Sequence, residues 1–259
     1  MKIELHKAYD RKVVEKPKLT IVMIHGIASD STTYNALLEV LEEREDLNDY
    51  RIVTYDLLGS GKSPSDDSLE YTYDEQIEAL HNAVSHLDLD SPLMLLGHSL
   101  GTFIVTRYAN TYPDEVSKLV LVSPPIYLPE DFDNPLFLAG MKAFEKSVSA
   151  RQKDILENKA FKNSMQNIIM DRNNYNVLAN IKTPTTIIYG NEDGLIAPQN
   201  IPKLMNDNPE IKVISVHGRH GVSSDKFEEI FGTFKATAEE LQARENSADS
   251  ANSDEQKDE

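Results

Sequence analysis

The feature that most constrains the fold is the regular alternation of short apolar runs with amphipathic stretches along the 259 residues. Most runs are nearly continuous in apolar residues, as expected of parallel strands that helices cover on both faces. Between them, segments such as 74–87 repeat apolar residues at helical spacing. This alternation predicts an α/β protein with a doubly wound, mostly parallel sheet. The predicted strands are 20–24, 51–55, 93–96, 118–122, 185–189 and 212–216, with one or two antiparallel edge strands from 2–15.

The segment 125–180 interrupts this alternation, because its sequence predicts two or three helices and no convincing strand. An all-helical insertion between two strands predicts a small cap on a core formed by 1–124 and 181–241. Insertions at this place cover the usual ligand site of such sheets. We expect most of its large apolar side chains to pack the cap onto the core and some to line a pocket. They are Phe132, Phe137, Met141, Phe144, Phe161, Met165, Ile168 and Met170.

Charge and composition exclude several classes of protein. The formal net charge of −17 disfavours nucleic acid and anionic membrane as partners. The absence of cysteine excludes disulfides and thiolate chemistry and disfavours a structural zinc site. No apolar run is long enough for a membrane span, and the first residues lack the apolar region of a signal peptide, so we expect a cytoplasmic protein.

The segment 242–259 is predicted to be a disordered acidic tail, because it holds no large apolar residue with which to bury surface. Two interpretations stay open for this tail. It either solubilises the protein or binds a partner.

The stretch Gly-His-Ser-Leu-Gly at 97–101 follows a predicted strand and precedes a predicted helix. In this context the pattern G-x-S-x-G indicates a nucleophile on a sharp turn. A side chain at Gly97 or Gly101 would crowd the neighbouring backbone, so both glycines leave room for the turn. The turn raises Ser99 above the sheet, where the N-terminus of the following helix favours a developing negative charge.

A serine needs a base to become nucleophilic, and the base needs an acid that orients it. Candidates for both follow later strands. Glu192 and Asp193 come after the strand at 185–189, and His217 and His220 come after the strand at 212–216. The chain order is therefore serine, acid, histidine, which is the order of the α/β-hydrolase arrangement.

Four motifs together resemble the α/β-hydrolase fold family, in its serine-hydrolase type, from near the N-terminus to about residue 240. "MIHGIASDSTTY" resembles the family's His-Gly segment, with Tyr34 at a usual aromatic position. "YDLLGSGKSP" resembles its D-x-x-G-x-G-x-S loop. "GHSLG" resembles its nucleophile elbow, and "YGNEDGLIAP" resembles the segment that carries its acid. The motifs do not specify a substrate, because this fold hosts many chemistries.

The resemblance implies a role for each site residue. Ser99 is expected to be the nucleophile, His220 the base, and Asp193 the acid that orients the base. The backbone amides of Ile27 and Leu100 are expected to form the oxyanion hole.

Two of these assignments have alternatives. His217 is the alternative base, because Arg219 stands where the family usually has glycine before the histidine. His217 lies at the end of the predicted strand, so it is expected to come too early in the chain and to be too buried to act as the base. Glu192 is the alternative acid, but Asp193 fits the G-x-x-D spacing of the family motif.

Neighbouring polar residues are expected to have structural roles. His25 should brace the loop that Gly26 allows to bend, and His98 should be a pocket or strand-packing residue rather than the base. Asp56 should cap its loop by accepting backbone N–H groups, because the following glycines lack the spacing of a phosphate-binding loop.

The sequence therefore predicts a hydrolase that needs no cofactor and no metal and cleaves a small carboxylic ester or related acyl compound through an acyl-enzyme. The same residues would serve a thioester, lactone or carbon–carbon bond hydrolase, or a hydrolase-like protein that senses a ligand under the cap. Asp at the elbow would mark a haloalkane or epoxide hydrolase, and this chain has Ser99 there. The oligomeric state stays open.

Overall fold

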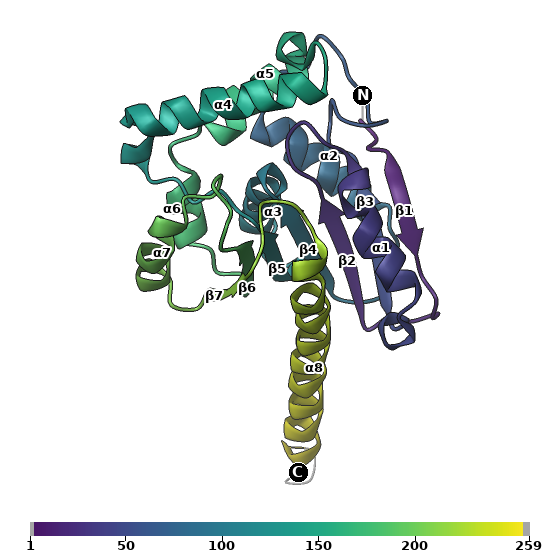
Figure 1. Ribbon diagram of the computed structural model, residues 1–259. Helices are drawn as coiled ribbons and strands as arrows, with labels where there is room; N and C mark the ends of the chain where they lie inside the picture. The colour runs from purple at the N-terminus through teal and green to yellow at the C-terminus, as the bar shows by residue number, and fades with distance from the viewer. Residues whose placement is uncertain (1–2, 256–259) are drawn as a thin grey trace.

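A seven-stranded sheet with helices on both faces forms the centre of the computed structural model, which describes residues 3–255 apart from the side chains of 245 and 248–255 (Figure 1). The strand order is β1-β3-β2-β4-β5-β6-β7. All neighbouring strands are parallel except β1, which pairs antiparallel with β3 at one edge. The predicted fold class is confirmed. The strands are β1 (Lys7–Arg11), β2 (Leu19–Ile24), β3 (Tyr50–Tyr55), β4 (Leu93–His98), β5 (Val116–Val122), β6 (Thr185–Gly190) and β7 (Lys212–Val216).

Each face of the sheet has its own hydrophobic core, because successive side chains of a strand point to opposite faces. In β2, Ile21 and Met23 pack on one face, while Val22 and Ile24 pack on the other. The helices α1 (Asn35–Glu42) and α8 (Ser224–Glu255) cover the first face. The second face is covered by α2 (Tyr73–Ser85), α3 (Leu100–Thr111), α6 (Asn174–Ala179) and α7 (Ile201–Asp207). Short helical turns are η1 (Ser31–Tyr34), η2 (Glu45–Leu47) and η6 (Pro198–Asn200).

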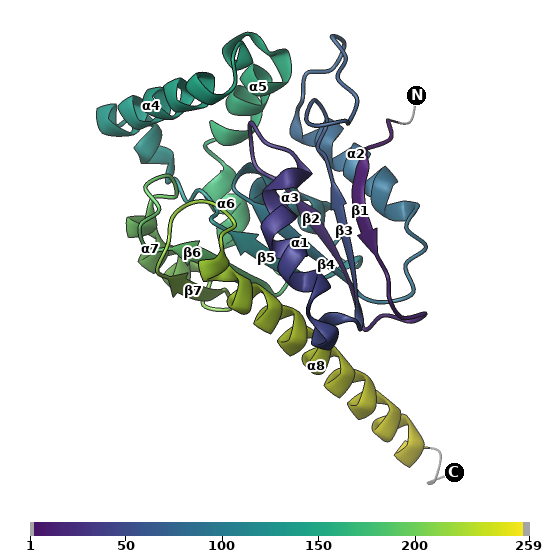
Figure 2. The same ribbon diagram turned by 45° about the vertical axis from the view of Figure 1, so that its right-hand side comes forward.

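The segment between β5 and β6, which the structure describes throughout, contains helices and no strand. Figures 1 and 2 show α4 and α5 over the end of the sheet that lies opposite the C-terminal half of α8. The division of the chain into core and cap at 125 and 180 remains our interpretation of this arrangement. Besides α6, the segment holds η3 (Pro129–Asp133), α4 (Pro135–Arg151), η4 (Ile155–Glu157), α5 (Lys159–Ser164) and the π-helical η5 (Met165–Ile169).

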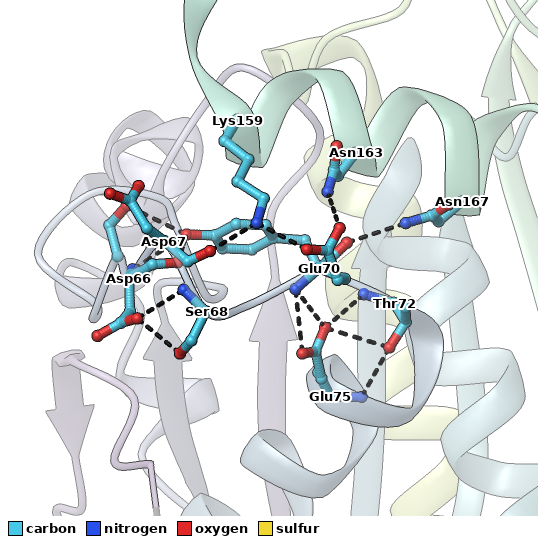
Figure 3. A network of polar contacts seen from close by, with 11 residues as sticks. Asp66, Asp67, Ser68, Glu70, Thr72, Glu75, Lys159, Asn163 and Asn167 are labelled. Atoms are coloured by element: carbon cyan, nitrogen blue, oxygen red, sulfur yellow. Dashed lines mark hydrogen bonds and ion pairs between the residues drawn. The ribbon is translucent and has the colours of Figure 1, made fainter.

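Glu70, in the loop between β3 and α2, fastens α5 to the core (Figure 3). Its carboxylate accepts hydrogen bonds from Lys159 Nζ at 2.7 Å and Asn163 Nδ2 at 2.8 Å. Its carbonyl accepts a third from Asn167 Nδ2 at 2.9 Å. The loop is itself held at the start of α2, where Thr72 and Glu75 form a capping box. The cap is thus bound to the core by polar contacts at α5 as well as by apolar packing.

The helix α8 continues past Leu241, where the sequence predicts that it ends, and runs to Glu255. The segment 242–255 is therefore helical where the sequence predicts disorder, and residues 256–259 lie outside the described residues. The Gln, Ala, Arg and Glu residues of this segment favour a helix, whereas its Ser, Asn and Asp residues oppose one. No helix in the described part of the chain, α8 included, is long and apolar enough to cross a membrane.

Candidate active site

Ser99 lies between the last residue of β4 and the first residue of α3, in a strained backbone conformation with φ of 51° and ψ of −118°. Residues other than glycine rarely adopt such a positive φ, and they keep it only where the surroundings enforce it. Here the Ser99 amide donates to the Val122 carbonyl of β5 at 3.0 Å. The Ser99 carbonyl in turn accepts from the Thr102 amide at 3.0 Å. The sharp turn predicted from the sequence is thus anchored on both sides.

The two glycines of the turn are required by close backbone approach. A Cβ atom on Gly97 would lie 2.5 Å from the Gly101 carbonyl oxygen, and one on Gly101 would lie 2.3 Å from the Ile24 carbonyl oxygen. Both distances are far inside van der Waals contact, and both neighbours are backbone atoms that cannot move independently. The predicted crowding at these positions is confirmed.

This crowding predicts the effect of a methyl group on stability. We expect Gly97→Ala to lower the free energy of unfolding by about 2 kcal/mol or more, because the backbone of α3 must shift away from β4. Gly232→Ala is the matched control in α8, because a Cβ there meets no atom within 4 Å. It should stabilise the helix by about 0.5–1 kcal/mol. Urea unfolding of both variants measures the difference, and equal effects would contradict the argument.

Of the two residues whose backbone amides are expected to bind an oxyanion, Leu100 directly follows Ser99 and Ile27 lines the same cavity as Ser99. Leu100 begins α3, so its N–H has no acceptor within the helix. Ile27 lies in the turn after β2, next to Gly26, where a Cβ would stand 3.0 Å from the Ser99 Cβ. His25 braces this loop, as predicted, because its Nδ1 donates to the Gly26 carbonyl at 2.7 Å and its Nε2 accepts from the Leu57 amide at 3.0 Å.

His220 and Asp193 are joined by a hydrogen bond of 2.8 Å between His220 Nδ1 and Asp193 Oδ2. The Asp193 side chain is fully buried, and its other oxygen accepts from the Leu195 amide at 2.9 Å. Burial by itself raises the pKa of the Asp193 carboxyl, but the hydrogen bond and charge of His220 and the Leu195 amide outweigh it. The pKa of Asp193 therefore lies below its usual value, and the group is ionised at neutral pH. An ionised carboxylate at Nδ1 favours the imidazole tautomer with its lone pair on Nε2.

The alternative residues lie elsewhere. The His217 side chain is 82% exposed, whereas the sequence suggested a buried position at the strand end. Its nearest carboxylate is Glu192, 3.8 Å from His217 Nδ1, and the Glu192 side chain is half exposed. This pair therefore faces solvent on the outside of the loop.

Ser99 and His220 line one cavity of about 720 Å³, a volume typical of small-molecule sites. Within the described residues they form no direct hydrogen bond with each other, and such bonds often tighten only when substrate binds. The cap closes the cavity with Phe144 and Val148 of α4, and Leu195 closes it from the loop after β6.

A second cavity of about 530 Å³ adjoins the first and shares the loop 26–29 and Gln152 with it. It extends under η4 and α5, where Phe161 forms part of its wall. Phe144 and Phe161 thus line the cavities, as expected of some cap side chains. Phe132, Met165 and Ile168 are buried in the core that joins cap and sheet.

The loop after β3 has the structural role predicted from the sequence. The Asp56 carboxylate accepts the amides of Ser31 at 2.8 Å and Lys62 at 2.9 Å. Its two oxygens thus hold the glycine-rich loop and the loop after β2 together. The described residues contain no group of three or more histidine, aspartate or glutamate side chains placed to hold a metal ion.

Sequence reasoning missed Val148, Leu195 and Gln152 as cavity residues. No local signal marks them. Val148 and Gln152 reach the cavity because α4 crosses above the elbow, and Leu195 reaches it from the loop after β6. The sequence pattern gives neither the direction of that crossing nor the path of that loop.

Residues 20–139 match a family model described as the alpha/beta hydrolase fold. Lipase 1 of Psychrobacter immobilis is 24% identical over 253 residues, which cover 86% of this chain and 78% of that protein. A putative non-heme chloroperoxidase of Synechocystis sp. is 41% identical over 118 residues, which cover 44% of this chain and 40% of that protein. A solved carboxylesterase structure from Nitrososphaera gargenis superposes with a TM-score of 0.70 at 16% identity, covering 91% of this chain and 96% of that chain.

Proposed function

We propose that this chain is a serine hydrolase of the α/β-hydrolase fold family, whose model matches residues 20–139, and that it cleaves a small carboxylic ester through an acyl-enzyme. One observation carries the proposal. Ser99 and His220 line one cavity that the cap also lines, and His220 is hydrogen-bonded to the buried Asp193 from a third loop. A serine, a base and a buried orienting carboxylate are the groups that acyl transfer requires.

In the proposed reaction, Ser99 Oγ attacks the ester carbonyl while His220 Nε2 accepts its proton. The backbone amides of Ile27 and Leu100 donate hydrogen bonds to the oxyanion that forms. The imidazolium of His220, stabilised by Asp193, then protonates the leaving alcohol. A water molecule, activated by the same imidazole, attacks the acyl-enzyme, and the serine leaves with a proton returned from His220.

The walls of the cavities support an ester with an apolar acyl group. Phe144, Val148 and Leu195 present apolar surface close to Ser99. The adjoining cavity mixes apolar side chains with hydroxyl and amide groups, among them Ser60, Gln76 and Asn158. The Lipase 1 relative supports ester substrates, although the fold also serves other acyl compounds.

The test is covalent labelling followed by an ester panel. A fluorophosphonate probe should label the folded protein at one site per chain, and p-nitrophenyl esters of increasing acyl length should be hydrolysed with an optimum set by the cavity. Heat-unfolded protein is the control for non-specific labelling. If the protein is neither labelled nor able to hydrolyse any ester, the serine-hydrolase proposal fails, and the alternative of a hydrolase-like protein that senses a ligand replaces it.

A further inference from the structure

Lys226, in the first turn of α8, is fully buried, with 0% of its surface exposed. Lysine is almost never fully buried unless its ammonium group is paired. Among the described residues Lys226 forms no ion pair with a carboxylate. Its Nζ instead donates to two main-chain carbonyls, at 2.5 Å to Arg219 and at 2.8 Å to Gly221.

These carbonyls belong to the residues on either side of His220. The carbonyl of His220 itself accepts a hydrogen bond of 2.9 Å from His98 Nε2. The carbonyl one residue before Arg219, that of Gly218, accepts from the Glu192 amide at 2.9 Å. Four consecutive carbonyls are therefore held by side chains or amides from three different parts of the fold.

The loop has few other restraints. His220 lies between the end of β7 and the start of α8, in a stretch with no regular secondary structure. Its imidazole must keep one nitrogen on Asp193 and present the other to Ser99, so a small rotation of the backbone would move Nε2 away from the serine. A displacement of about 1 Å in such a group can cost about 100-fold in rate.

His98 is suited to act as a neutral donor. It is buried, and burial, helped by the charges of His220 and Lys226, lowers the pKa of His98 to about 3. Its Nδ1 has no hydrogen-bond partner among the described residues, so the proton belongs on Nε2, where the carbonyl of His220 accepts it. His98 also directly precedes Ser99, and this bond ties the elbow to the loop of the base.

Burial lowers the pKa of Lys226, while the nearby charges of Asp193 and Asp225 raise it, so burying this ammonium group costs free energy. An apolar side chain would avoid that cost, but it could not donate hydrogen bonds to the carbonyls on both sides of His220.

We propose that Lys226 and His98 are positioning residues, which hold three consecutive carbonyls around His220 and so fix its imidazole between Asp193 and Ser99. The proposal rests on the proposed function, since it assumes that His220 is the base. It gives a specific role to His98, the variable residue before the serine in the G-x-S-x-G pattern, which is a hydrogen bond to the His220 carbonyl on the other side of the site.

The first test compares Lys226→Met with Lys235→Met, a matched change on the same helix at a partly exposed lysine that pairs with Asp46. We expect Lys226→Met to lower kcat about 30-fold or more, with KM changed by less than about twofold. Lys235→Met should leave both constants at the wild-type values. A fully active, folded Lys226→Met protein would overturn the proposal.

A second pair of variants, His98→Gln and His98→Leu, tests the proposal even if Lys226→Met does not fold. The amide nitrogen of His98→Gln can still donate to the His220 carbonyl, whereas His98→Leu cannot. We expect His98→Gln to retain most of kcat and His98→Leu to lose about 10-fold or more. Equal kcat values for the two variants would overturn the role of His98.

A spectroscopic signature separates this proposal from the proposed function. The proton between His220 Nδ1 and Asp193 should give a strongly deshielded proton NMR signal that disappears in Asp193→Asn. In Lys226→Met and His98→Leu it should shift or broaden, and in Lys235→Met it should stay. If the wild-type protein hydrolyses no ester, the proposed function fails, yet this signal still tests the positioning. An unchanged signal in both variants would overturn the proposal whatever the activity.

Discussion

Ser99→Ala is expected to abolish labelling by a fluorophosphonate probe and to lower kcat on the best ester by about 10⁶-fold, leaving only the residual acceleration that the oxyanion hole and substrate binding provide. The probe forms a bond to the nucleophilic oxygen, so removing that oxygen removes the reaction rather than weakening binding. Substrate binding should change little, because Ser99 presents only a small part of the cavity wall.

Ser147→Ala is the matched control for this variant. Ser147 is a serine of α4 that lines the same cavity, and within the described part of the chain its hydroxyl has no hydrogen bond to a histidine or a carboxylate. Its loss should leave labelling intact and kcat within about twofold of the wild-type value. Labelling that persists in Ser99→Ala would show that another residue is the nucleophile, and mass spectrometry of the labelled peptide would identify it.

His220→Ala is expected to lower kcat by about 10³-fold or more, whereas His217→Ala should leave it within about twofold. The His220 ring contacts the buried Asp193 and lines the cavity, while the His217 side chain is 82% exposed and faces Glu192. Of the two histidines, only His220 lines the cavity that Ser99 also lines. Steady-state kinetics on the same ester measures both.

The double variant Ser99→Ala/His220→Ala sharpens this test. If the two residues act as one unit, the double variant should be no slower than Ser99→Ala alone. Additive losses would mean that His220 affects the rate by another route. A large loss in His217→Ala, with His220→Ala active, would reverse the assignment of the base.

Much of the fold could be predicted because strands and helices follow from the spacing of apolar residues. The predicted strands at 20–24 and 212–216 correspond to β2 and β7, with bounds that differ by at most one residue. The C-terminal helix is where prediction and structure differ. The absence of large apolar residues after 241 indicates that the segment has no apolar face to bury, but it does not exclude a helix, which the Gln, Ala, Arg and Glu residues of this segment favour.

The sequence by itself determined the alternation of strand and helix and the conformation of the elbow, because both depend on residues that are neighbours along the chain. Gly97 and Gly101 have no side chain where the sharp turn brings backbone segments close together, and the motif alone reveals this requirement. Tertiary structure alone decided which side chains surround Ser99. The exposure of His217, the placement of Phe144 over the cavity and the burial of Lys226 against the loop of His220 all depend on long-range packing. Residue spacing specifies a local backbone, whereas the direction of a side chain in a loop is set by elements that lie far away in the sequence.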